Sequence, residues 1–146
     1  MPTLSEVLTS ERAKGRVVED CCALIDAEVK DKGGISGLAI KAGYGAVKSV
    51  KPGFVKNVVS DLLPEFALAL DPIYQEAKTA GKPVADFFVA HSSRVAEALL
   101  AITDEKAKRA KNNLVKGTYE KLRGTAKKNV EAAAPRLGKM VETHTS

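Results

Sequence analysis

The stretch PVADFFVAHSSRVAEALLAI, residues 83–102, decides the fold class of this 146-residue chain. Its apolar residues recur every three or four positions, which is the spacing of one face of an α-helix. Pro83 fits the first position of a helix, because the N–H group that proline lacks would have no partner there. The pattern predicts a helix over residues 83–102 whose apolar face consists of Val84, Phe87, Phe88, Val95, Ala98, Leu99 and Ile102.

The same helical spacing recurs along the rest of the chain, and strand signals are nearly absent. Glycine and proline separate the segments, and Ser10 and Asp104 are suitable N-caps. We expect a compact single-domain bundle or orthogonal array of about seven to eight helices over residues 1–146, with residues 1–9 loosely packed and residues 143–146 frayed. The expected helices cover about residues 3–8, 10–31, 36–50, 52–63, 64–80, 83–102 and 104–123, the last extending to 133 if Gly124 does not break it, and Pro135 starts a final segment.

His91 is the polar residue that looks misplaced, because it falls in the middle of the apolar stripe of residues 83–102. A buried imidazole without a hydrogen-bond partner costs ~1–3 kcal/mol. We favour a core histidine that is satisfied by one of four conceivable partners, namely Glu28, Tyr44, Tyr74 and Tyr119. The alternative is a ligand-contacting or acid–base histidine in an internal pocket, as in an apolar-ligand carrier or an enzyme. One candidate base without a nucleophile or an oxyanion site is no catalytic constellation, so no catalytic residue is predicted.

Small residues are concentrated in the segment over residues 33–46. Glycine inside a helix costs ~0.5–1 kcal/mol relative to alanine, so several glycines together require a compensating contact. Ala39, Gly43 and Ala46 share one face, where they would let a neighbouring helix approach closely. A membrane-surface helix is the alternative, since Lys41 and Lys48 lie on the other face, but no Trp or Phe would anchor it. We therefore predict close helix packing.

Charge is unevenly distributed: residues 61–105 are rich in acids, and residues 106–146 are rich in bases. On a continuous helix, one ridge would consist of Arg109, Lys116, Arg123 and Lys127. Such a ridge could bind nucleic acid or another anionic surface through phosphates. A solvated basic face, or a helix packed beside an acidic one, explains the same pattern. We favour the solvated face, because no nucleic-acid-binding motif accompanies it.

Motifs for cofactors, metals and membranes are missing from the sequence. The two cysteines, Cys21 and Cys22, are adjacent, and neighbours on a helix point about 100° apart, so we expect no disulfide between them. This cysteine usage indicates a reducing compartment, and we predict a cytoplasmic protein. With His91 and His144 as its only histidines, the chain is not expected to hold a multi-histidine metal site, and no cofactor or metal is predicted. The longest uncharged runs fall short of the ~18–20 residues that span a bilayer, so no transmembrane segment is expected.

Three segments are distinctive as text: EDCCALIDAEVKDKGGISGLAIKAGYGAVKSVKPGFV (residues 19–55), LLPEFALAL (residues 62–70) and YEKLR (residues 119–123). They resemble a family of small, uncharacterised, all-helical bacterial proteins. The resemblance implies a self-standing bacterial domain, and it carries over no activity and no functional residue. Because catalytic motifs are absent and amphipathic helices are abundant, we predict a non-enzymatic interaction module that binds a protein partner or a second copy of itself through a helix face.

Overall fold

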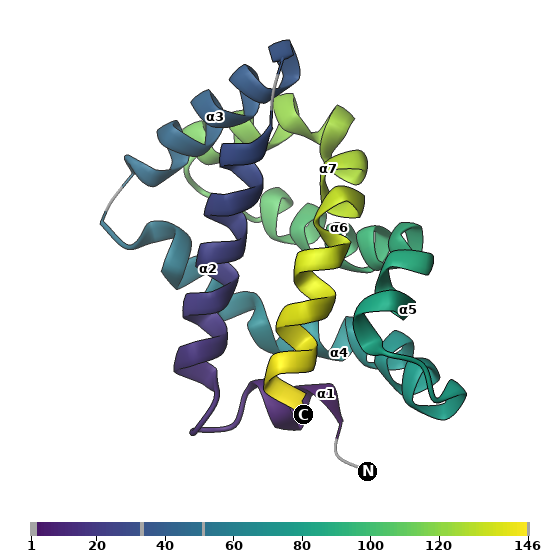
Figure 1. The fold of residues 1–146 in the computed structure, drawn as a ribbon. Helices are drawn as coiled ribbons and strands as arrows, with labels where there is room; N and C mark the ends of the chain where they lie inside the picture. The colour runs from purple at the N-terminus through teal and green to yellow at the C-terminus, as the bar shows by residue number, and fades with distance from the viewer. Residues whose placement is uncertain (1–2, 33, 51, 146) are drawn as a thin grey trace.

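The computed structural model describes residues 3–32, 34–50 and 52–145, and every regular element within these ranges is an α-helix. The all-α prediction is confirmed, and the described part of the chain forms seven helices (Figure 1). In chain order they are α1 (Leu4–Leu8), α2 (Lys14–Asp31), α3 (Gly34–Lys48), α4 (Phe54–Ala80), α5 (Val84–Ala90), α6 (Ser92–Lys108) and α7 (Asn113–Thr145).

The long helix α7 connects most of the fold. Figure 1 shows that its first part crosses behind α3, after which the helix turns and its last part descends beside α2 to end next to α1. On the way it contacts α5 and α6, and α4 closes the far side of the molecule. The buried apolar core is built from α1, α2, α4, α5, α6 and the last part of α7, with Phe88, Val95 and Val141 fully enclosed. Among the residues of α3 whose side chains are described, 37–48, none belongs to this core.

The N-terminal helix α1 is packed against the core, which corrects the expectation that residues 1–9 are loose. The side chains of Leu4 and Leu8 are 0% and 2% exposed. The backbone N–H of Leu4 donates a 2.7 Å hydrogen bond to Oδ1 of Asp71 in α4, and Thr3 caps the helix by accepting from the N–H of Glu6. Because α1 and α4 are far apart in the sequence, no local pattern could show this docking.

Helix α4 is one continuous element, whereas the sequence predicted separate helices over residues 52–63 and 64–80. Pro64 and Pro72 both lie inside it. A proline inside a helix leaves the carbonyl four residues earlier without its usual donor. Those carbonyls belong to the half-buried Ser60 and the exposed Leu68, and neither residue is enclosed in the core. The helix therefore tolerates both prolines.

The predicted helix over residues 83–102 is divided at His91 into α5 and α6. The backbone of His91 has φ −116° and ψ 33°, which is not helical. Its N–H donates to the carbonyl of Phe87, and its carbonyl accepts from the N–H of Val95, so hydrogen bonds continue across the break. The following serines, Ser92 and Ser93, favour helix ends over helix interiors. The seven residues of the expected apolar face are nonetheless buried or half-buried, so the break leaves that face turned towards the core.

The C-terminal region also differs from expectation. Asp104 lies inside α6 and does not cap a helix. The cap of α7 is Asn112, whose Oδ1 accepts from the N–H groups of Leu114 and Val115 at 2.9 and 3.2 Å. Gly124 and Pro135 are both inside α7. The described end of the chain is not frayed, because α7 continues to Thr145; residue 146 lies outside the described residues.

Candidate functional site

His91 is half-buried on the surface side of the α5–α6 break and is not a core residue. Its ring stacks on Phe87, with the ring centroids 4.3 Å apart and the planes tilted by 38°. Three of the partners expected for it are engaged elsewhere: Glu28 with Arg136, Tyr44 with Asp26, and Tyr119 with Asp104. His91 itself is half-buried and its ring contacts Phe87, so the prediction of a fully buried core histidine is wrong.

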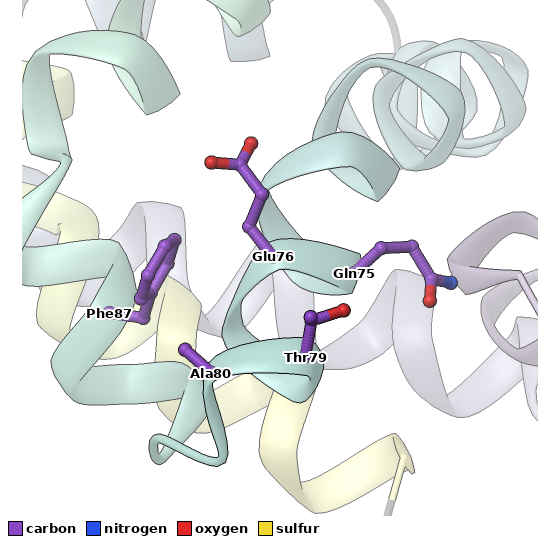
Figure 2. A pocket seen from close by; sticks show the side chains of 5 residues that line it. All are labelled: Gln75, Glu76, Thr79, Ala80 and Phe87. Atoms are coloured by element: carbon purple, nitrogen blue, oxygen red, sulfur yellow. The ribbon is translucent and has the colours of Figure 1, made fainter.

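A shallow depression lies beside Phe87, and Figure 2 shows its lining. The Phe87 ring comes from α5, and the other four side chains come from the last turns of α4: Gln75, Glu76, Thr79 and Ala80. Gln75 points away from the Phe87 ring, and the carboxylate of Glu76 forms a two-pronged ion pair with Arg94 of α6, at 3.0 and 2.6 Å. His91 stacks behind Phe87 and does not line the depression. The polar groups here do not converge on one point, as a reaction site requires.

The four bases expected to form one ridge do not share a helix. Arg109 is the residue that ends α6, and Lys116 lies in the second turn of α7. Arg123 forms a two-pronged ion pair with Asp104 of α6, at 2.8 and 3.1 Å, and Lys127 pairs with Glu97 of α6 at 3.0 Å. The alternative of one continuous ridge of four bases is therefore not realised, and the pairing of Arg123 and Lys127 fits the other interpretation, a helix packed beside an acidic one. Of the four bases, Arg123 and Lys127 of α7 are therefore paired with acidic residues of α6 within the molecule.

Asp104 is the centre of the polar contacts between α6 and α7. Besides Arg123, it accepts a hydrogen bond from the hydroxyl of Tyr119, and Thr103 lies 2.8 Å from the same hydroxyl. The hydrogen bond from Arg123, followed by that from Tyr119, holds the pKa of Asp104 below its ordinary value of 3.8. Burial and the Asp104 carboxylate raise the pKa of Tyr119. The cluster joins two helices and keeps Tyr119 protonated, which is a structural role.

Replacing Asp104 by asparagine is expected to destabilise the protein at neutral pH, with an effect that disappears in acid. Because the folded pKa of Asp104 is lowered, the ionised carboxylate stabilises the fold above its ordinary value of 3.8, and this stabilisation is lost as the pH falls through the lower folded value. Thermal unfolding of the wild type and of Asp104→Asn from pH 7 to pH 2.5 measures the difference between their melting temperatures. A difference in melting temperature that stays constant over this range would contradict a stabilising role for the ionised carboxylate of Asp104.

Of the three residues predicted to mediate close helix packing, Gly43 lies at a helix contact. A Cβ atom added to Gly43 would lie 3.0 Å from the side chains of both Thr118 and Leu122 in α7. Ala46 is half-buried, whereas Ala39 is exposed. The face of α3 turned to α7 is therefore rotated from the predicted one. Another glycine of this helix, Gly37, is buried against the backbone of Lys32, where an added Cβ would approach to 2.7 Å.

The opposite face of α3 is exposed and consists largely of small residues. The side chain of Leu38 is 69% exposed, the largest fraction among the exposed large apolar residues of the described chain. Ala39, Ala42 and Gly45 are also exposed on this helix. Its charged residues are Lys41 and Lys48, and no acidic residue occurs between positions 34 and 48. Hereafter, the α3 outer face means Leu38, Lys41, Ala42, Gly45 and Lys48.

Two contacts that hold α7 in place were not found from the sequence. Gly138 is buried against α5, and an added Cβ would lie 2.6 Å from Cα of Ala85. Arg136 donates to both Glu28 and Asp31 of α2, which raises its own pKa and lowers the pKa of Asp31. In both contacts the two partners are more than 50 residues apart in the sequence, so no local pattern could predict them. The one local signal was a glycine three residues after Pro135 in a helical pattern.

The two cysteines are free thiols with suppressed reactivity. Burial, reinforced by the neighbouring Cys22, raises the pKa of Cys21 to about 12. Burial also raises the pKa of Cys22. A thiol must ionise to act as a nucleophile or a metal ligand, so both groups stay protonated at neutral pH. The residues described by the structure contain no group of three or more histidine, cysteine or acidic side chains placed to hold a metal ion. Within the same ranges, no helix has both the length and the apolar character that crossing a bilayer demands.

Together these observations define an all-helical protein whose polar side chains, in the described part, mainly tie one helix to another. The chain belongs to a family of unknown function (DUF6918), whose sequence pattern matches residues 4–145. This match confirms the resemblance to a family without an assigned activity. No curated protein and no solved structure matches the chain.

Proposed function

We propose that this protein is a non-enzymatic interaction module that binds another protein through the α3 outer face. The observation that supports the proposal is the exposure of Leu38, at 69%, among small side chains. Burying a leucine side chain in an interface contributes about 1.5–3 kcal/mol. The surrounding alanine and glycine residues would let the backbone of a partner helix approach closely.

Other exposed apolar residues support the proposal less. Leu68, Val89 and Leu114 lie on α4, α5 and α7, and singly exposed apolar residues are normal on protein surfaces. Helix α3 differs from these positions because none of its described side chains belongs to the main core and it is poor in charge along its whole length. A bacterial, cytoplasmic setting belongs to the same proposal, supported by the family resemblance and by the free, protonated thiols.

Leu38→Glu is expected to abolish capture of the partner, because a carboxylate would then have to be buried in the interface. The tagged wild-type chain, the Leu38→Glu variant and a control, Leu114→Glu, are each used to capture proteins from a lysate of the source cells. The control changes another exposed leucine on α7. We expect the wild type and the control to retain the same partner and Leu38→Glu to lose it.

Circular dichroism of the three proteins should be the same, since each change lies on the surface. Equal recovery by Leu38→Glu and the wild type, or equal loss from both variants, would argue against α3 as the docking face.

A further inference from the structure

We propose that the α3 outer face of one copy docks against the outer face of α4 in a second copy of this chain. The inference rests on the proposed function of α3 and names its partner. The outer face of α4 is defined here as Asp61, Glu65 and Leu68, all of which are exposed. These residues are spaced by four and three positions, so they form one stripe along the helix.

The two faces are complementary in charge. The α3 outer face carries lysines and an exposed leucine, and the α4 outer face carries carboxylates and an exposed leucine, Leu68, at 62% exposure. Within the described residues, neither Asp61 nor Glu65 forms an ion pair. Lys41 likewise has no partner there, and Lys48 lies 3.9 Å from Asp26 in an exposed pair. Lys41, Asp61 and Glu65 are therefore available for a partner, whereas Lys48 also contacts Asp26 and the Tyr44 ring of its own chain.

The register of the two stripes also matches. In α3 the leucine precedes the lysines, and in α4 the leucine follows the acids, which suits an antiparallel pair. With Leu38 beside Leu68, Lys41 and Glu65 each lie three residues, or about 4.5 Å, along the axis from the leucine contact. Measured along the axis from the leucine contact, Asp61 lies at about 10 Å and Lys48 at about 15 Å. A lysine side chain is long enough to span the difference of about 5 Å.

Gly45 supplies an independent observation. A Cβ atom added there would meet nothing within 4 Å, so packing inside the single chain does not require glycine at this position. Gly37 and Gly43 in the same helix do meet neighbours at 3.3 Å or less. In the antiparallel pair, Gly45 lies level with Asp61, where the missing side chain lets the two helix backbones come together.

The contact is heterologous, because each copy offers one α3 face and one α4 face. Such contacts build rings or open chains of copies. A single helix pair buries less than the ~1,200 Å² of a stable standard interface, so association is weak and depends on concentration. The ion pairs are exposed at their edges, and salt screens them.

The decisive experiment is charge reversal with mixing, followed by sedimentation velocity over a range of concentrations at low salt. Lys41→Glu and Glu65→Lys are each expected to raise the dissociation constant about tenfold or more, because like charges then face each other. In an equal mixture, the intact α3 face of the Glu65→Lys chain meets the intact α4 face of the Lys41→Glu chain. The mixture, and the double variant Lys41→Glu/Glu65→Lys, should therefore associate like the wild type.

Lys111→Glu and Glu120→Lys are the matched controls, since both positions are exposed and lie outside the two faces. They should leave association unchanged. A wild-type protein that stays monomeric at all concentrations overturns the inference, and so does a mixture that fails to associate while the wild type does. An α3–α3 pairing would instead be indifferent to Glu65→Lys, because Glu65 lies on α4. A third outcome is possible: the wild type is monomeric, and in the capture experiment Leu38→Glu loses a protein other than this chain. That outcome would support the proposed function of α3 and would reject a second copy of the chain as its partner.

Discussion

Leu4→Ala is expected to lower the free energy of unfolding by roughly 2–5 kcal/mol, the cost of removing a fully buried leucine side chain. Leu4 is 0% exposed, and its backbone N–H is bonded to Asp71 of α4. The substitution leaves a cavity between α1 and α4, and the short helix has few other contacts with which to fill it. The effect would show that this five-residue helix is an integral part of the core.

The control for Leu4→Ala is Leu114→Ala, at a leucine that is 49% exposed. Truncation at an exposed site usually changes stability by about 0.5 kcal/mol or less. Urea unfolding followed by circular dichroism gives both values. If Leu4→Ala were as mild as Leu114→Ala, the docking of α1 would be contradicted, and the loose N-terminal segment expected from the sequence would be restored.

Gly138→Ala is expected to lower the free energy of unfolding by about 1–3 kcal/mol, as overpacking in a core does. The added methyl group would lie 2.6 Å from Cα of Ala85 and 3.2 Å from its Cβ. A backbone atom cannot rotate away, so α5 and α7 must separate. Separation would also strain the hydrogen bond in which the N–H of Ala85 donates to Glu142 at 2.9 Å.

Gly124→Ala is the matched control, because it makes the same chemical change in the same helix. A Cβ atom at Gly124 meets nothing within 4 Å. Alanine favours a helix interior over glycine by about 0.5–1 kcal/mol, so this variant should be more stable than the wild type. The two substitutions therefore have opposite expected signs in one unfolding assay. Equal stabilisation by both would show that α5 and α7 do not approach as closely as described.

Several features of the fold were readable from the sequence because they depend on local chemistry. The spacing of apolar residues identified helices, and the small residues of the second long segment indicated a close contact, which Gly43 makes with α7. Local spacing did not show which side of that helix faces inward. Ala39 and Gly43 are four residues apart, yet Ala39 is exposed, because the position of α7 sets the contact.

The candidate sites were less predictable, for a related reason. The spacing of residues 83–102 predicts one helix with His91 on its apolar face, but the backbone angles at His91 interrupt the helix there, and the side chain is half-buried. Arg123 and Lys127 look like free cations in the sequence. Their partners Asp104 and Glu97 lie 19 and 30 residues away, and the packing of α6 on α7 joins them. The sequence shows the sign of a surface charge, but it does not show whether a distant residue neutralises that charge.

The sequence by itself determined that this protein is all-helical and that its thiols and histidines match no familiar catalytic motif. These properties follow from residue-level preferences and a period of 3.6 residues. The tertiary structure alone decided that α1 is buried, that Arg123 and Lys127 of α7 are paired with acidic residues of α6, and that Gly138 tolerates no side chain while Gly124 does. These three features depend on contacts between residues that are far apart in the sequence. Only packing brings residues more than fifty positions apart within a few ångströms.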